Sequence, residues 1–262
     1  MWKKFFLDTI FPQFCLGCGK EGSIICEDCL SLIEISEFVY CPFCKTPKRV
    51  FGESLFTNSQ ERVSNGSTET SKRFQYRGTC PSHQKMKLSG VFSATSYKNP
   101  LVQNLIKKFK YEPFLKTLAS PLAYLIISHF LLTENKIIFK DQFNSLLVPV
   151  PLLSSKKRDR GFNQSEEIAQ KLSSFFKIPF LTNNLIKIKK TQPQVELKRQ
   201  GREENIKGAF RIENPQEIQG KRIFLIDDIF TTGSTMEECA RVLKQAGARE
   251  VWGIVVAREP LE

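Results

Sequence analysis

The chain has 262 residues, of which 41% are hydrophobic, and this is enough for one α/β domain of about 170 residues and a smaller domain stabilised by metal. Thirty-nine Lys and Arg against 27 Asp and Glu give a net charge of +12, which suits an anionic partner, either a nucleic acid or a sugar phosphate. The longest apolar segment, residues 118–132, contains Pro121 and His129 and is shorter than the ~20 residues of a membrane-spanning helix. We therefore expect no membrane span and interpret this segment as a core helix.

Paired cysteines dominate the amino-terminal third of the chain. Three Cys-x-x-Cys pairs and one Cys-x-x-His pair share one spacing, and each two-residue gap lets a tight turn direct both side chains at one metal ion. Four such pairs are enough for two tetrahedral zinc sites, and the predicted ligands are Cys15, Cys18, Cys26, Cys29, Cys41, Cys44, Cys80 and His83. The first two pairs are close enough for one hairpin to form a four-cysteine site. A second site made of the other two pairs is less determined, and crossed pairing, with the first and third pairs on one ion, is an alternative.

Thirty-five residues separate Cys44 from Cys80, and the polar composition of most of them, about residues 46–79, predicts a flexible insertion. Within it, Phe74 and Tyr76 lie among basic residues and could stack on the bases of single-stranded DNA. A basic segment with no partner explains the same composition. Both interpretations stay open from the sequence alone.

Disulfide bonds in a secreted domain are the alternative to zinc. The apolar stretch at the start of the chain is interrupted by Asp8 and stops at Pro12, and no small-residue cleavage site follows, so a secretory signal is not expected. We therefore expect a cytoplasmic protein with reduced thiols. Cys239, alone in a helical pattern, is interpreted as a small buried hydrophobe, and His129 as structural.

A domain boundary is predicted near Ser89, where the strand-like run LSGVFSATSYKN begins. This divides the chain into residues 1–88, a cysteine-rich zinc-binding domain that contains the flexible insertion, and residues 89–262, an α/β domain.

A basic run follows the apolar strand that starts at Leu146 and ends with Pro149 and Pro151. A charge run alone usually marks a solvated face. Here, however, it comes between a strand and the segment RGFNQ, which leads into an amphipathic helix, and guanidinium groups bind diphosphate oxygens bidentately. We predict an anion-binding loop that contains Lys156, Lys157, Arg158 and Arg160.

The segment IFLIDDIFTTGST, residues 223–235, places two acids, Asp227 and Asp228, at the end of a buried strand, where open α/β sheets bind their ligands. The acids can accept hydrogen bonds from two neighbouring sugar hydroxyls, or hold Mg²⁺ against a diphosphate. The next residues precede a helix and offer hydroxyl and backbone N–H groups to a phosphate: Thr231, Thr232, Gly233, Ser234 and Thr235. An acidic strand end before an ordinary capped helix is the alternative. No Walker A sequence is present, which is evidence against hydrolysis of adenine nucleotides.

These motifs resemble those of known families. Residues 223–235 resemble the motif that binds phosphoribosyl diphosphate (PRPP) in type I phosphoribosyltransferases. VPVPL followed by RGFNQ, together with FKYEPF around Lys110 and Tyr111, resembles the ComF competence proteins, a bacterial branch of this group. A third stretch fits the same family and lies where phosphoribosyltransferases have a mobile lid; its matching residues are Thr191, Gln194, Leu197, Arg202, Asn205, Gly208 and Phe210. The resemblance covers nearly the whole chain and implies an α/β fold, with a type I phosphoribosyltransferase-like parallel sheet flanked by helices and a small amino-terminal zinc-ribbon-like domain.

The resemblance also implies roles for the site residues. PRPP would bind with Mg²⁺, the acids Asp227 and Asp228 would hold the ribose hydroxyls, and residues 231–235 would hold the 5-phosphate. Four cations would stabilise the departing diphosphate: Lys156 and Lys157 as binding residues, Arg158 and Arg160 as catalytic residues. Purine-salvage relatives have an aspartate where this chain has Thr231, so a purine acceptor is not expected.

Two functional hypotheses follow. The first is an active phosphoribosyltransferase with an unknown acceptor. The second is a non-catalytic, PRPP-sensing DNA-uptake factor that binds single-stranded DNA or a partner helicase, for which steeply salt-dependent DNA binding is expected.

Overall fold

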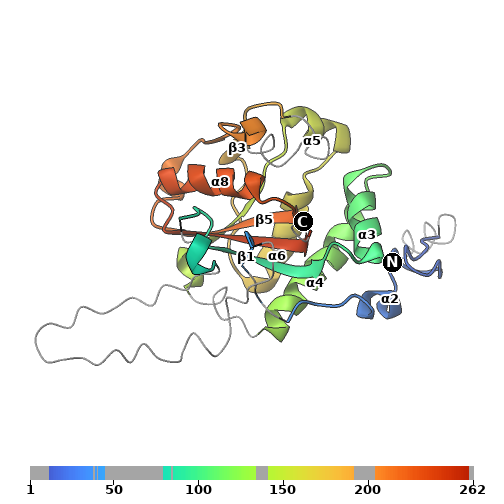
Figure 1. Ribbon diagram of the computed structural model, residues 1–262. Coiled ribbons are helices and arrows are strands. Elements are labelled where there is room, and N and C mark those ends of the chain that lie inside the picture. The colour runs from blue at the N-terminus through green and yellow to red at the C-terminus, as the bar shows by residue number, and fades with distance from the viewer. Residues whose placement is uncertain are drawn as a thin grey trace, which may run out of the picture.

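The computed structural model describes residues 12–37, 39, 41–44, 79–83, 85–133, 141–191 and 204–259 (Figure 1). The predicted flexible insertion, apart from Thr79, lies outside these residues, together with the aromatic residues proposed to stack on DNA. Most of the predicted lid also lies outside them, including Gln194, Leu197 and Arg202. Among the described helices, none combines the length and the apolar character needed to cross a membrane.

A four-stranded, fully parallel sheet forms the centre of the molecule, in the order β1-β6-β5-β2. Its strands are β1 (Gly90–Ser96), β2 (Ser145–Pro149), β5 (Arg222–Phe230) and β6 (Glu250–Arg258). The inner strands β5 and β6 are buried over most of their length, as expected for a parallel sheet that is covered on both faces. The predicted parallel sheet flanked by helices is therefore confirmed.

Helices cover both faces of this sheet (Figure 1). On one face, α4 (Ala119–Leu132) and α6 (Gln164–Phe176) pack against each other and against the strands. On the other, α8 (Ser234–Gln245) packs against β6 and against β4 (Phe210–Ile212), which pairs antiparallel with β3 (Leu185–Lys187). Further helices in the described ranges include α2 (Glu27–Ser31), α3 (Pro100–Lys110) and α5 (Ser154–Arg160).

The core beneath α4 is built from aromatic rings. Phe92 of β1 stacks on Trp252 of β6 with ring centroids 5.4 Å apart, and Phe130 of α4 lies 4.9 Å from Phe92. His129 is buried beside them, as expected for a structural residue, and its Nδ1 donates a hydrogen bond of 2.6 Å to the carbonyl of Ser36. The apolar segment predicted to be a core helix forms α4.

The cysteine-rich region packs directly against this core. Ile33, Val39 and Phe43 belong to the same buried cluster as the side chains of the sheet. The backbone N–H of Ser36 also donates to the carbonyl of Ala94 in β1, at 2.8 Å. The division at residues 88 and 89 stays a prediction, but side chains from both sides of it share one hydrophobic core.

Candidate sugar-phosphate and metal sites

The two adjacent acids, Asp227 and Asp228, lie near the carboxyl end of β5, which continues to Phe230. Because successive side chains of a strand point to opposite faces, the two carboxylates meet different neighbours. Asp228 is only 2% exposed, and its Oδ1 lies 2.9 Å from Nζ of Lys110, the last residue of α3. Asp227 Oδ1 accepts hydrogen bonds of 2.9 Å from Ser165 Oγ and from the backbone N–H of Asp228.

Burial and mutual repulsion set the charge of this acid pair. Burial, followed by the charge of Asp228, raises the pKa of Asp227 to about 7. Burial alone would lower the pKa of Lys110, but attraction to Asp228 and Asp227 raises it overall, so the lysine stays charged. The cluster of two acids and one lysine therefore carries little net charge at neutral pH. It can accept hydrogen bonds from sugar hydroxyls without strongly repelling the phosphate groups of the same ligand.

The RGFNQ segment builds one wall of the site. Gly161 ends α5 with a φ of 77°, and Asn163 caps α6 by accepting from Ser165 N while its Nδ2 donates to the carbonyl of Val150, just after β2. Gln164 Nε2 donates to the carbonyl of Phe109 in α3. The segment thus ties the end of β2, the end of α3 and the start of α6 together, and this holds Ser165 beside the acid pair.

The basic run forms helix α5, so the prediction of a basic loop was wrong for residues 154–160. The four cations also do not converge on one point. Lys157 pairs with Glu166 at 2.7 Å, whereas Arg160 lies over the ring of Tyr111, 5.8 Å from its centroid, and donates to Gln164 Oε1. A seven-residue helix with a glycine at its end explains this spread, because neighbouring side chains point in different directions around the axis.

Lys157 and Arg158 line a cavity of about 560 Å³ between the end of β2, α5 and β3. Lys187 of β3 lines the same cavity and donates to Thr191 Oγ1 at 2.8 Å. Burial and the charge of Lys156 lower the pKa of Lys187. Three cations and one acid, Glu166, line the cavity, so its lining is positive overall. No sequence pattern pointed to Lys187, apart from its place near a residue of the ComF pattern.

The hydroxyl-rich loop, residues 231–235, lies at the start of α8. Gly233 is the N-cap residue of α8, with a φ of 81°, and it has no side chain that could cap the helix. Thr232 Oγ1 and Ser234 Oγ lie 2.9 Å apart. Glycine is required at position 233 for a second reason, because a Cβ there would lie 2.4 Å from the ring of Phe230. An uncapped helix start beside two hydroxyls is suited to a phosphate.

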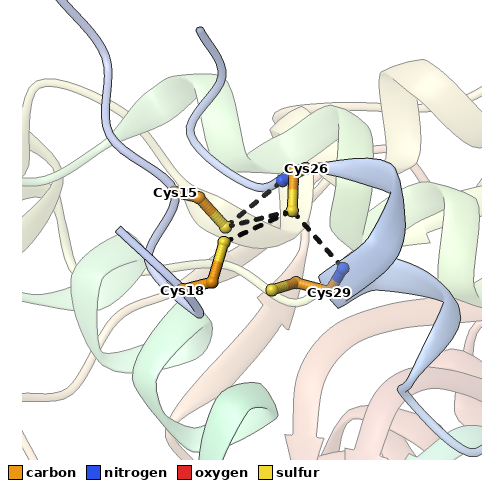
Figure 2. Close-up of side chains that lie close together, drawn as sticks. All are labelled: Cys15, Cys18, Cys26 and Cys29. Atoms are coloured by element: carbon orange, nitrogen blue, oxygen red, sulfur yellow. Dashed lines mark hydrogen bonds between the residues drawn. The ribbon is translucent and has the colours of Figure 1, made fainter. Parts of the chain in front are cut away.

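The first two cysteine pairs form one cluster. Figure 2 shows the sulfur atoms of Cys15, Cys18, Cys26 and Cys29 directed toward one another, with Cys26 also capping α2. Cys26 Sγ lies 3.6 Å from the sulfur atoms of Cys15 and Cys18, and backbone N–H groups of Gly17 and Cys26 donate to Cys15 Sγ. Burial opposes ionisation, but these backbone donors and that of Cys18 lower the pKa of the Cys15 thiol to about 6.

The third cysteine pair and the Cys-x-x-His pair form a second cluster, which also contains the 3₁₀ turn Pro81–His83. Cys80 Sγ lies 3.4 Å from Cys44 Sγ and 3.3 Å from His83 Nδ1, and Cys41 Sγ lies 3.5 Å from the same nitrogen. Burial opposes ionisation here too, but hydrogen bonds with His83 and Cys44 lower the pKa of the Cys80 thiol to about 6. The described residues thus group the pairs as first with second and third with fourth, and not in the crossed arrangement.

Both clusters fit a tetrahedral zinc ion. Zn–S bonds of ~2.3 Å and Zn–N bonds of ~2.0 Å place sulfur ligands ~3.8 Å apart and a sulfur ~3.5 Å from a nitrogen. The ligand atoms of each cluster all lie within 4.8 Å of one another, and the S–N separations in the second cluster are 3.3 to 3.6 Å. Thiolates and imidazole are the ligands that structural zinc prefers, so both clusters could hold zinc.

The chain is similar to several known proteins. A family model for the phosphoribosyl transferase domain matches residues 158–261. Competence protein F from Haemophilus influenzae is 29% identical over 265 residues, which cover 95% of this chain and 99% of that protein. DNA utilization protein YhgH from Salmonella typhimurium is 32% identical over 164 residues, which cover 62% of this chain and 70% of that protein. Among solved structures, a purine phosphoribosyltransferase from Pyrococcus horikoshii is 16% identical, with a TM-score of 0.29, and the match covers 53% of this chain and 90% of that one. The chain belongs to the ComF family of phosphoribosyltransferase-like proteins.

Proposed function

We propose that this protein binds PRPP with Mg²⁺ and transfers the phosphoribosyl group to an acceptor. The observation that carries the proposal is the placement of the acid pair of β5 and the uncapped start of α8 at the same end of one strand. A ribose 5-phosphate presents two neighbouring hydroxyls and one phosphate. This strand end offers carboxylates that can accept hydrogen bonds from the hydroxyls, and N–H and hydroxyl groups that can donate to the phosphate.

The residues of the chain have distinct roles in this proposal. Asp227 and Asp228 accept hydrogen bonds from the ribose hydroxyls, while Ser165 and Lys110 fix the two carboxylates. Loop 231–235 holds the 5-phosphate. The bond from the anomeric carbon to diphosphate breaks as the acceptor's nucleophile bonds to that carbon, and diphosphate leaves with the electron pair. Lys157 and Arg158 of α5, which line one cavity, stabilise this leaving group, and bound Mg²⁺ would neutralise further charge, so positioning and electrostatics supply the acceleration.

We further propose that each cysteine cluster holds one structural zinc ion and that the protein is cytoplasmic. Cysteine thiols stay reduced in the cytoplasm and are then available as zinc ligands. The zinc ions have no part in the transfer chemistry.

A role in DNA uptake or use is a second candidate, supported by the names of the relatives, Competence protein F and DNA utilization protein. In this version the protein senses PRPP without transferring it and binds single-stranded DNA or a helicase, and its net charge of +12 suits the former. Affinity for a single-stranded oligonucleotide that falls steeply between low and physiological salt would support this candidate. Affinity that hardly changes with salt, or no binding, would exclude its DNA component.

Calorimetric titration of PRPP into the zinc-loaded protein with Mg²⁺ tests the main proposal. The matched control is the double variant Asp227→Asn, Asp228→Asn, which keeps the size of both side chains. Binding by the wild type that disappears in the variant would support the site and justify a screen for acceptors. A folded wild type that does not bind PRPP would refute both the transferase and the PRPP-sensing versions.

A further inference from the structure

Phe43 lies in the turn between Cys41 and Cys44 and is 6% exposed. Its ring centroid is 5.8 Å from that of His83, a member of the second cluster. On its other side it meets the ring of Phe230 edge to face, with centroids 6.2 Å apart. One side chain therefore touches both a candidate metal ligand and the residue that ends β5.

Phe230 in turn supports the loop proposed to hold the 5-phosphate. Its ring fills the space beside Gly233, where a Cβ would lie only 2.4 Å away. Phe230 is 1% exposed, so it has little freedom to move while its neighbours stay in place. The rings of Phe43 and Phe230 thus form a continuous packed connection from the second cluster to the backbone of Gly233.

Hydrogen bonds tie both arms of the second cluster to the elements that flank this loop. Arg258, at the end of β6, donates from Nη2 to the carbonyls of Pro42 and Cys44, at 3.1 Å each. Glu237, in the first turn of α8, accepts from the backbone N–H groups of Lys87 and Leu88 at 2.7 and 3.0 Å. The cluster is therefore attached to the end of β6 and to the start of α8.

The first cluster packs elsewhere. Asn104 of α3 donates to the carbonyl of Leu16, and a Cβ on Gly17 would lie 3.4 Å from the side chain of Leu101, also in α3. This difference provides a comparison within the same chain, because an aromatic residue, Phe14, also lies next to a cysteine of the first cluster.

We propose that Phe43 is a positioning residue, through which the second metal cluster sets the geometry of the phosphate-binding loop. This inference rests on the proposed binding of PRPP. A metal ion in the cluster fixes the turn that carries Phe43, which holds Phe230 against Gly233 and keeps the N–H groups at the start of α8 aligned. Without Phe43, the ring of Phe230 gains space to move and the donors lose their alignment, while the acid pair and the cations of α5 keep their own supports.

The test uses the full-length, zinc-loaded protein and three variants: Phe43→Ala, Phe43→Leu and, as a control at the first cluster, Phe14→Ala, which removes a more exposed ring. Zinc per chain, thermal midpoint, and calorimetric affinities for ribose 5-phosphate and for Mg²⁺-diphosphate are measured for each. Phe43→Ala is expected to retain its zinc, to bind ribose 5-phosphate about tenfold more weakly, and to bind diphosphate as the wild type does. Phe43→Leu should recover part of the loss, and Phe14→Ala should bind both ligands normally.

The comparison between the two ligands separates positioning from general destabilisation, which would weaken both. Equal binding of ribose 5-phosphate by the wild type and Phe43→Ala would overturn this inference and leave the proposed function intact, as would a parallel loss of both ligands. If Phe43→Ala does not fold, Phe43→Leu decides by the same comparison. Absence of binding by the wild type to PRPP and to both part-ligands would instead refute the proposed function.

Discussion

Lys110 Nζ lies 2.9 Å from Oδ1 of Asp228, so the last residue of α3 compensates the charge of a carboxylate that is almost fully buried in β5. Two elements far apart in the sequence meet at this ion pair. Their contact determines how much negative charge the acid pair presents at the edge of the sheet.

Lys110→Met should leave Asp228 buried without its partner. Removing one member of a buried ion pair destabilises a protein strongly, and we expect a loss of about 2–3 kcal/mol in the free energy of unfolding at pH 8, measured by urea denaturation. Lys116→Met is the control, because the Lys116 side chain, which pairs with Glu167, is 61% exposed, and the change there should be within about 0.5 kcal/mol. Equal effects of the two substitutions would contradict the structural role of the Lys110 pair.

The raised pKa of Asp227 predicts a pH-dependent contribution to stability. The folded protein holds this proton more tightly than the unfolded chain, so the contribution is fully present below the unfolded pKa of ~3.9 and is lost as pH rises through the folded pKa of about 7. The stability of Asp227→Asn relative to the wild type should therefore rise by about 2–3 kcal/mol from pH 5 to pH 8, measured by urea unfolding at both values. If the difference in unfolding free energy between the two proteins does not change with pH, the raised pKa of Asp227 is disproved.

Gly233→Ala should disturb the loop at the start of α8 through both the φ of 81° and the collision with Phe230. We expect a loss of about 2–3 kcal/mol in unfolding free energy and weaker binding of PRPP. Gly247→Ala is the matched control, since its φ of 90° is also left-handed but the nearest atom to its Cβ is at 3.4 Å. It should cost only about 1 kcal/mol and leave PRPP binding unchanged. The collision is unimportant if the two substitutions behave alike.

The grouping of cysteines can be measured by counting zinc. Cys15 and Cys26 lie in one cluster, whereas Cys41 lies in the other. The double variant Cys15→Ser, Cys26→Ser should therefore keep one zinc ion per chain, and Cys15→Ser, Cys41→Ser should keep none, as measured by elemental analysis of the purified proteins. Crossed pairing predicts the reverse result for both variants.

Local patterns predicted much of the fold. The strand, acid, loop and helix order of residues 222–245 is present, because an apolar run followed by acids and a glycine-containing turn constrains each step locally. The spacing of the cysteine pairs likewise determines which side chains a tight turn can bring together.

Contacts between distant segments could not be predicted in this way. The bond from Ser165 to Asp227 depends on the position of α6 over the sheet, which no local pattern specifies. The charge density at residues 156–160 is visible in the sequence and predicts a single basic loop, whereas the helix that spreads these cations depends on packing. The contact between Phe43 and Phe230 has no sequence signal, since each residue is an ordinary core aromatic in its own segment.

Phe43, Phe230 and the vacant side-chain position of Gly233 share one small volume between the second cluster and the start of α8. Because position 233 has to stay glycine, a larger side chain at position 43 has to be balanced by a smaller one at position 230. Across the evolution of the family, these two positions are therefore expected to covary in size, although one lies in the cysteine-rich turn and the other at the end of β5.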